Sequence, residues 1–372
     1  MPSLQARQLE SIDRLRGAAE PWDDLWRRSP VTIPTVRAEL IAVWLEHFAP
    51  ATPFRALVVE QGDAGRLVAA IPLVQKRLGR MIRCGGLTSN YWSPNGELLL
   101  DPEADRTTAL DILADGMERL PWPLLWFDMV PSDSPHWRTM VAVLRRRGMR
   151  VDIHHRWHVG RIVFSGDVEA YFASRSKNLR RSLQKDARRL EQDAPIQFHL
   201  EDHFSPDAVE ARLRELFAIE DRGWKGEAGG SVLQHPLAFE FYRRQALQLA
   251  EWGDLRVARL MHGERTIAFD LGWLGGGFYH SYKVGYDPEY REFGPGHLLR
   301  ERLVRTLGQG GDVRGIDFQG PKTEALAAWS TEEYPIARLV IAQRRAAGRV
   351  LWIAYRGLAP LVRLARWAKR LW

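Results

Sequence analysis

The sequence is poor in cysteine and lysine, and it lacks long apolar runs. Cys84 is the single cysteine among 372 residues, which excludes a disulfide within the chain and a zinc site built on cysteines. No segment reaches the roughly eighteen consecutive apolar residues that a membrane-spanning helix requires. The N-terminal residues include acidic side chains and no apolar segment typical of a secretory signal. These absences favour a globular chain in a reducing cytoplasm.

Acidic residues are missing from the C-terminal segment 334–372. That segment holds nine arginines or lysines and no aspartate or glutamate, whereas the whole chain has a net charge of +7. The remainder therefore has 44 basic and 46 acidic residues, a net charge of −2. A nucleic-acid-binding fold usually carries a basic patch on its body, so nucleic acid is not the expected partner. Only seven of the 53 basic residues are lysine, an arginine bias typical of GC-rich bacterial genomes.

Length and composition favour two globular domains. A chain of 372 residues is longer than one ordinary domain, and 45% hydrophobic and 27% charged residues are typical of a globular protein. Alternating apolar runs, turn residues and helical periods predict a mixed α/β (α+β) architecture, with helices up to about residue 48. We expect an N-terminal half at 1–160, a C-terminal half at 161–345 and a basic amphipathic helix at 346–372.

The two halves repeat one order of elements. In the first, a strand hairpin and a helix precede a strand that ends in Trp126-Phe127-Asp128. In the second, a hairpin at 255–274, a strand at 278–286 and a helix at 297–308 precede Gly315-Ile316-Asp317. The parallel suggests a duplication, although any two α/β units share some of this order. Only the second half has a glycine-rich entry to the helix before its last strand.

The clearest chemical pattern lies between Tyr290 and Leu299, which read R-x-x-G-x-G between a strand and a helix. Glycines there allow a tight turn and bring backbone amides close to a ligand. The helix that follows offers unpaired N–H donors and a positive dipole end, which bind phosphate, and Arg291 can add a charge-assisted contact. An ordinary strand–turn–helix joint has the same pattern. The residues expected to hold a phosphate-bearing cofactor are Arg291, Gly294, Pro295, Gly296, His297 and Leu298.

This pattern resembles the pyrophosphate-binding motif of the GNAT acyltransferases. The longer run from His280 to Leu299, together with the run from Gly315 to Gly320, is similar to the cellulose-biosynthesis acetyltransferase (CelD/BcsL) family. The resemblance covers about 170–330 and implies tandem GNAT-like domains, as in the Fem aminoacyltransferases, each with a mixed, mostly antiparallel sheet flanked by helices. After Gly320 the chain departs from the family, because Pro321-Lys322-Thr323-Glu324 replaces an acidic residue followed by Tyr-Lys.

The resemblance implies direct acyl transfer from acetyl-CoA to an amine or hydroxyl. Such chemistry needs a backbone N–H that polarises the thioester carbonyl, a base for the nucleophile and an acid for the thiolate. The strand 278–286 is expected to supply that amide and to contact the cofactor at Val284 and Tyr286. Tyr282 is the candidate acid, or else a packing tyrosine. Asp317 is the candidate base or substrate orienter, or else a helix N-cap.

Further residues are expected on the acceptor side of the site. They are Trp224, Lys225, His280 and Lys322. Strand alternation places Tyr282 and His280 on one face and Lys283 on the other. The histidines at 154–158 have no cysteine and few acids nearby, so no metal site is expected.

The resemblance also suggests a role in making or decorating a surface polysaccharide, with a small-molecule or saccharide acceptor. The tail 346–372 has the basic, Trp-containing amphipathic pattern of an interfacial helix, so peripheral membrane contact is one interpretation and a helix docked on the protein body is the other. Two alternatives for function stay open. One is a Fem-type transferase that uses aminoacyl-tRNA and meets RNA at the basic helix 174–190. The other is a non-catalytic membrane scaffold held by its tail.

Overall fold

The computed structural model describes residues 3–62, 65–78 and 82–368, with side chains to residue 357 except that of Trp224. The chain folds into two compact units. Unit 1 comprises Met1–Val31, Thr35–Arg156 and Pro335–Trp372, and unit 2 comprises Thr32–Pro34 and Trp157–Tyr334. Residues 335–345, which the sequence analysis places in the C-terminal half at 161–345, belong to unit 1 in this division.

Unit 1 consists of one sheet and the helices on it. Its strands are β1 (Leu4–Leu9), β2 (Phe54–Gln61), β3 (Arg66–Leu78), β4 (Ile82–Leu87), β5 (Leu99–Leu100) and β6 (Leu124–Pro131). Its helices are α1 (Ile12–Gly17), α2 (Ala19–Arg28), α3 (Ala38–Phe48), α4 (Arg106–Arg119), α5 (Pro135–Arg146) and α13 (Ala346–Ala368). The 3₁₀ turn η1 (Pro34–Val36) begins in unit 2 and ends in unit 1.

Unit 2 is built in the same way. Its strands are β8 (Ile196–Glu201), β9 (Leu255–His262), β10 (Arg265–Gly275), β11 (Phe278–Tyr286) and β12 (Gly315–Pro321). Its helices are α6 (Val168–Ala173), α7 (Lys177–Glu191), α8 (Pro206–Arg222), α9 (Trp224–Glu227), α10 (Pro236–Glu251), α11 (Pro295–Gly310) and α12 (Glu324–Ala327), with 3₁₀ turns η2 (Val232–Gln234) and η3 (Pro288–Phe293).

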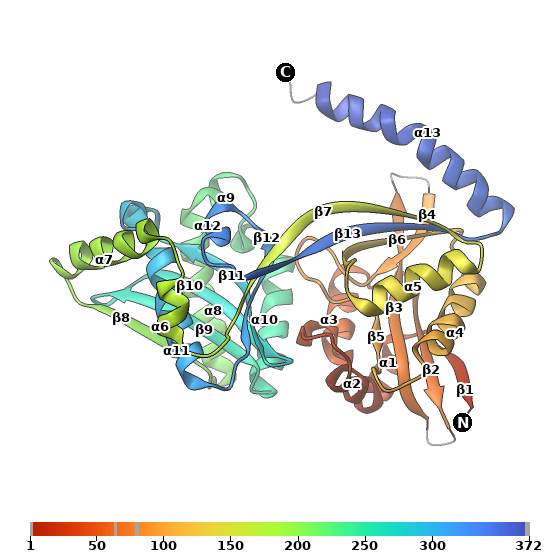
Figure 1. The fold of residues 1–372 in the computed structure, drawn as a ribbon, viewed down its shortest axis with the longest axis horizontal. Helices are drawn as coiled ribbons and strands as arrows, with labels where there is room; N and C mark the ends of the chain where they lie inside the picture. The colour runs from red at the N-terminus through yellow and green to blue at the C-terminus, as the bar shows by residue number, and fades with distance from the viewer. Residues whose placement is uncertain (1–2, 63–64, 79–81, 369–372) are drawn as a thin grey trace. The chain divides into compact units, whose positions relative to one another are not determined.

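Two long strands connect the units. β7 (Arg150–Val163) begins in unit 1 and pairs with β12 in unit 2, and β13 (Glu332–Ala342) begins in unit 2 and pairs with β6 in unit 1 (Figure 1). The strand order is β1-β2-β3-β4-β6-β13 in unit 1 and β8-β9-β10-β11-β12-β7 in unit 2. In each unit one neighbouring pair along this order is parallel, β4 with β6 and β11 with β12, and the other neighbours are antiparallel. The two sheets therefore share one topology, and the expected mixed α/β fold class is confirmed.

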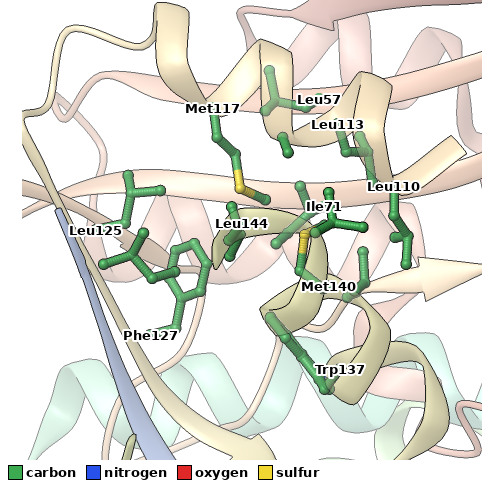
Figure 2. Close-up of a cluster of buried hydrophobic side chains, with 14 of the residues drawn as sticks. Leu57, Ile71, Leu110, Leu113, Met117, Leu125, Phe127, Trp137, Met140 and Leu144 are labelled. Carbon is green, nitrogen blue, oxygen red and sulfur yellow. The ribbon is translucent and has the colours of Figure 1, made fainter. Parts of the chain in front are cut away.

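Each sheet is stabilised by a separate apolar core. In unit 1, Figure 2 shows Met117 of α4 and Trp137 and Met140 of α5 turned toward Ile71 of β3 and Phe127 of β6, all buried. In unit 2, α6, α7 and α11 cover one face of the sheet through Phe172, Leu183, Leu298 and Leu303. Burial of these apolar side chains is the largest favourable contribution to the free energy of folding.

The N-terminal prediction is wrong in one respect. Leu4–Leu9, expected to be helical, forms β1 and pairs with β2 from Leu4↔Gln61 to Leu9↔Ala56. The helices of the segment begin only at Ile12. Leu4 is half-buried and Leu9 is buried, whereas Gln5, Ala6 and Arg7 are exposed, as expected of a strand at the edge of a sheet. Among the described residues, no helix has the length and apolar character needed to cross a bilayer.

Candidate functional site

The parallel strands β11 and β12 separate partway along their length. They pair only at Phe278↔Gly315, Tyr279↔Ile316 and His280↔Asp317, although β11 continues to Tyr286 and β12 to Pro321. Backbone groups on this edge of β11 after His280 are thus left without a partner on β12. An extended ligand can occupy such an edge by hydrogen bonding to the strand.

A β-bulge lies at the same point of β11. Leu271 of β10 pairs with Lys283 and the next residue, Gly272, pairs with Ser281, so Tyr282 is the extra residue. A Cβ at Gly272 would lie 2.4 Å from the carbonyl oxygen of His280, which is why glycine is required there. Bulges redirect side chains near functional sites, and this one brings Tyr282 beside the point where the strands separate.

The bulge corrects the predicted alternation. The ring of Tyr282 lies 5.8 Å from the ring of Tyr242 on α10, and the Nζ atom of Lys283 lies 5.1 Å from the same ring. Tyr282 and Lys283 therefore face α10 together, and the expectation that they lie on opposite faces is wrong. Tyr282 also packs against Trp273 at 4.1 Å between ring centroids, and its hydroxyl lies 3.5 Å from that of Tyr242. Burial lowers the pKa of Lys283 to about 8, opposed by the charge of Glu220.

A hydrogen-bonded network joins the ends of the paired segments of β11 and β12. The carboxylate of Asp317 accepts bonds from the backbone N–H of Gln319 at 2.9 Å, from its side-chain amide at 2.9 Å, and from the hydroxyl of Tyr334 at 3.0 Å. The same amide nitrogen of Gln319 lies 2.8 Å from Nδ1 of His280. Asp317 and His280 are both buried, so the network holds Gln319 in one orientation.

The protonation of His280 follows from its partners. Its Nε2 faces the carbonyl oxygens of Thr32 and Gly275 at 3.2 and 3.3 Å, and only a protonated Nε2 bonds to them. Burial lowers the pKa of His280, which keeps the ring neutral and leaves Nδ1 as an acceptor for Gln319. Gln319 has a φ of 56°, a left-handed conformation that non-glycine residues adopt at a cost and often near functional sites.

The first turn of α11 is open. Its N-cap is Gly294, with φ 55° and ψ 47° and no side-chain hydrogen bond to the helix. A Cβ placed on Gly296 would meet no atom within 4 Å, and one on Gly294 would meet nothing closer than 3.9 Å. Pro295 has no N–H, and the amides of His297 and Leu298 point toward the carbonyl oxygen of Gly294. The free space around Gly294 and Gly296 and the positive end of the helix suit a phosphate group.

Side chains around this helix start add polar groups. Arg291 is exposed, and its guanidinium makes no ion pair within the described part of the chain. The indole of Trp329 donates to Nδ1 of His297 at 3.0 Å, and burial lowers the pKa of His297. The imidazole is therefore neutral, with its proton on Nε2. Asp186 of α7 is an acidic group that opposes an anion there, since its carboxylate would lie 4.0 Å from a Cβ placed on Gly294. Leu298 is buried in the core, and its backbone N–H donates to the carbonyl oxygen of Gly294 at 3.3 Å.

Of the remaining predicted residues, Lys225 and Lys322 have partners in unit 2. Lys225 bonds to Glu220 at 2.6 Å and to the carbonyl oxygen of Val284 at 3.3 Å, so it reaches the free part of β11. Lys322 pairs with Glu333. Val284 and Tyr286 are 41% and 37% exposed, unusually high for apolar strand residues. The side chain of Trp224 lies outside the described residues.

Sequence reasoning missed three members of the site. Gln319, Tyr334 and Glu220 come from β12, β13 and α8, and each makes a hydrogen bond to a residue of another helix or strand. Gln319 lies inside the run from Gly315 to Gly320, yet nothing in that pattern marks its left-handed backbone. Among the described residues, no group of three or more His, Cys, Asp or Glu side chains is placed to hold a metal.

Comparison with protein families defines the class. Residues 177–329 match the family model described as an acetyltransferase (GNAT) domain, so this part of unit 2 has a GNAT-type acyltransferase fold. The match contains the whole of β11, η3 and α11 and ends at Trp329. No match was found among curated proteins. The more specific resemblance to the cellulose-biosynthesis family stays a prediction.

Particular solved structures resemble both units. FemX has 11% identity and a TM-score of 0.55, over 88% of this chain and 96% of its own. The C-terminal domain of a putative lysylphosphatidylglycerol synthetase from Agrobacterium fabrum has 12% identity and a TM-score of 0.54, over 92% and 97%. A protein of unknown function from Bacteroides thetaiotaomicron has 10% identity and a TM-score of 0.54, over 92% and 100%. At such identities the similarity establishes the fold alone.

Proposed function

We propose that the chain transfers an acyl group, in the simplest case acetyl, from CoA directly to an amine or hydroxyl of a small-molecule or saccharide acceptor. The observation that carries the proposal is the open first turn of α11 next to the unpaired edge of β11. The GNAT family match over the same residues supports it. A role in surface polysaccharide synthesis rests on the sequence resemblance.

The donor would bind to two features of unit 2. Its diphosphate would meet the backbone amide of Gly296 together with Arg291, because an oriented N–H group and a helix dipole stabilise anions. Its extended pantetheine arm would run along the free edge of β11 near Val284. This arrangement would place the thioester beside the bulge at Tyr282.

The chemistry would then depend on groups near the bulge. A backbone amide there would polarise the thioester carbonyl while the acceptor attacks it and the C–S bond breaks. Tyr282 would protonate the departing thiolate and regain a proton from the acylated amine or hydroxyl. We propose that Asp317 orients rather than deprotonates, because its carboxylate already accepts bonds from Gln319 and Tyr334. The acceptor would approach along the segment from Gln319 to Lys322.

A matched pair of glycine substitutions in α11 tests the donor site. Gly296→Glu places a carboxylate at the first turn, and Gly310→Glu places one at the last turn; a Cβ at either position meets no atom within 4 Å. We expect Gly296→Glu to weaken acetyl-CoA binding at least tenfold in isothermal titration, because the new charge repels the diphosphate. Gly310→Glu should bind as wild type does. Wild-type protein that does not bind millimolar acetyl-CoA would count decisively against the proposal.

An aminoacyl-tRNA donor is the second candidate. The exposed face of α7 presents Lys177, Arg181, Lys185 and Arg188, all within one stripe of the helix and opposite the buried Leu183 and Leu190. Such a stripe suits a polyanion. Salt-sensitive tRNA binding in the absence of any acetyl-CoA binding would favour this candidate over the first.

A further inference from the structure

Unit 1 contains a cavity that the proposed transferase does not use. Its volume is about 530 Å³, and it lies where the end of α4, the residues after β13 and the start of α13 meet. Four arginines and two acidic residues line it, so the lining has a net charge of +2. The acids are Asp115 and Glu118.

Two of the arginines are already paired. Arg119 forms an ion pair with Asp115, and Arg344 donates to Glu118 at 3.1 Å. Arg147, outside the lining, also donates to Glu118, at 2.9 Å. The carboxylates of the cavity wall are thus neutralised by neighbours and add little repulsion.

The other two arginines, Arg345 and Arg349, are exposed and make no ion pair within the described residues. They are separated by one turn of α13, about 6 Å along the helix axis. Side chains four residues apart lie on the same face of a helix, so the two guanidinium groups can reach a single phosphate and bind it with oriented N–H donors.

The start of α13 strengthens the attraction for an anion. The amide of Arg349 bonds to the carbonyl oxygen of Arg345, so the helix begins beside the cavity, and its first turn has no acidic residue. The first amides of a helix have no partner within it, and its N-terminal end is positive. A Cβ on Gly348 would lie 2.4 Å from the carbonyl oxygen of Gln343, so glycine allows this first turn to pack against Gln343.

Gln343 adds an independent sign of a ligand. Its side-chain nitrogen donates to the carbonyl oxygens of Met117 and Leu120 at 2.8 and 3.2 Å, which uses both of its hydrogens. Its Oε1 atom is buried and accepts no hydrogen bond. An unsatisfied buried acceptor in the wall of a polar cavity indicates a missing donor, such as a ligand hydroxyl.

We infer that this cavity binds a phosphate ester that carries neighbouring hydroxyl groups, with the phosphate on Arg345 and Arg349 and the hydroxyls toward Gln343. A membrane lipid headgroup and a free polyol phosphate share this chemistry. The site is separate from the donor site of unit 2 and does not depend on the proposed function.

The test measures two sources of the ligand with the full chain. Binding of sn-glycerol 3-phosphate is followed by isothermal titration, and binding to vesicles of phosphatidylglycerol or phosphatidylcholine by co-sedimentation. Binding of the free ester alone assigns a soluble polyol phosphate. Binding to phosphatidylglycerol vesicles, with displacement by the free ester, assigns a lipid headgroup.

Two variants separate the site from general charge and folding effects. Arg345→Gln with Arg349→Gln should weaken binding at least tenfold, while the matched double variant Arg138→Gln with Arg150→Gln, at exposed positions of the same unit, should stay within twofold of wild type. Ala347→Glu should also lose at least tenfold, although an acid in the first turn stabilises a helix. The inference is overturned if wild type binds neither source, or if the Arg345/Arg349 variant binds as the control does.

Discussion

The two units have the same strand order, but the helix that joins their parallel strands starts differently in each. In unit 1, α4 is capped by Asp105, whose carboxylate accepts bonds from the backbone N–H of Thr108 at 3.1 Å and from its hydroxyl at 2.7 Å. In unit 2, α11 is capped by Gly294, which has no side chain to offer. The N-terminus of α4 is thus capped by a carboxylate of the chain, whereas the N-terminus of α11 has no side-chain cap.

The strand after each helix shows the same contrast. Asp128 of β6 pairs with Arg338 and accepts from the indole of Trp126 at 2.9 Å, so its partners are ordinary structural ones. Asp317 of β12 instead holds Gln319 and Tyr334. Met129 and Gln319, which follow these aspartates, are the two non-glycine residues with positive φ among the described ones. The backbone irregularity is shared, whereas the polar network beside the open helix belongs to unit 2.

The largest expected effect concerns a buried charge in unit 2. Asp270 of β10 is buried, which raises its pKa from 3.8 to about 6, although hydrogen bonds from Ser281 and Tyr279 and the charge of Arg300 oppose this. The folded state then binds more protons than the unfolded state between pH 3.8 and 6, so the free energy of unfolding falls as pH rises through that window. Two pKa units correspond to roughly 3 kcal/mol.

Asp270→Asn checks this expectation, because asparagine does not titrate. Urea unfolding of wild type between pH 4 and 7 should show the loss of stability, and the variant should be nearly independent of pH over the same range. Lys76 of β3 in unit 1 is half-buried, and desolvation lowers its pKa from 10.5. Its effect on the free energy of unfolding therefore has the opposite slope and acts below pH 10.5. An identical pH dependence in wild type and Asp270→Asn would refute the role given to Asp270.

The second expectation exchanges the helix caps. Gly294→Asp gives α11 the kind of cap that α4 has, and aspartate tolerates a φ near 55° better than most residues. The carboxylate should repel the diphosphate and weaken acetyl-CoA binding about a hundredfold, equivalent to about 2.7 kcal/mol. Gly294→Asn, of the same shape and without charge, should stay within a few-fold of wild type. An equal loss of acetyl-CoA affinity in both variants would mean that the shape of the side chain, not its charge, impairs binding.

The sequence predicted local elements of the fold well, and long-range pairings poorly. The hairpin at 255–274, the strand 278–286 and the glycine entry to α11 follow from alternation and turn residues, which act over a few positions. The pairing of β13 with β6 of unit 1 and the bulge at Tyr282 depend on contacts between strands that are separated in the sequence. The bonds of Gln319 to His280 likewise require the folded sheet. The side chains of 358–372, on which the amphipathic tail depends, lie outside the described residues.

The smallest expected effect concerns the closed helix. Asp105→Ala removes the cap of α4 and should lower the free energy of unfolding of unit 1 by about 1 kcal/mol, because the amide of Thr108 loses its acceptor. Affinity for acetyl-CoA should not change, since Asp105 lies in unit 1 and the proposed donor site lies in unit 2. Hydrogen exchange at Thr108 and titration with acetyl-CoA measure the two quantities on one sample. If the variant instead altered acetyl-CoA binding, the acyl donor would depend on α4 as well as on α11. The proposal that only unit 2 binds the donor would then be wrong.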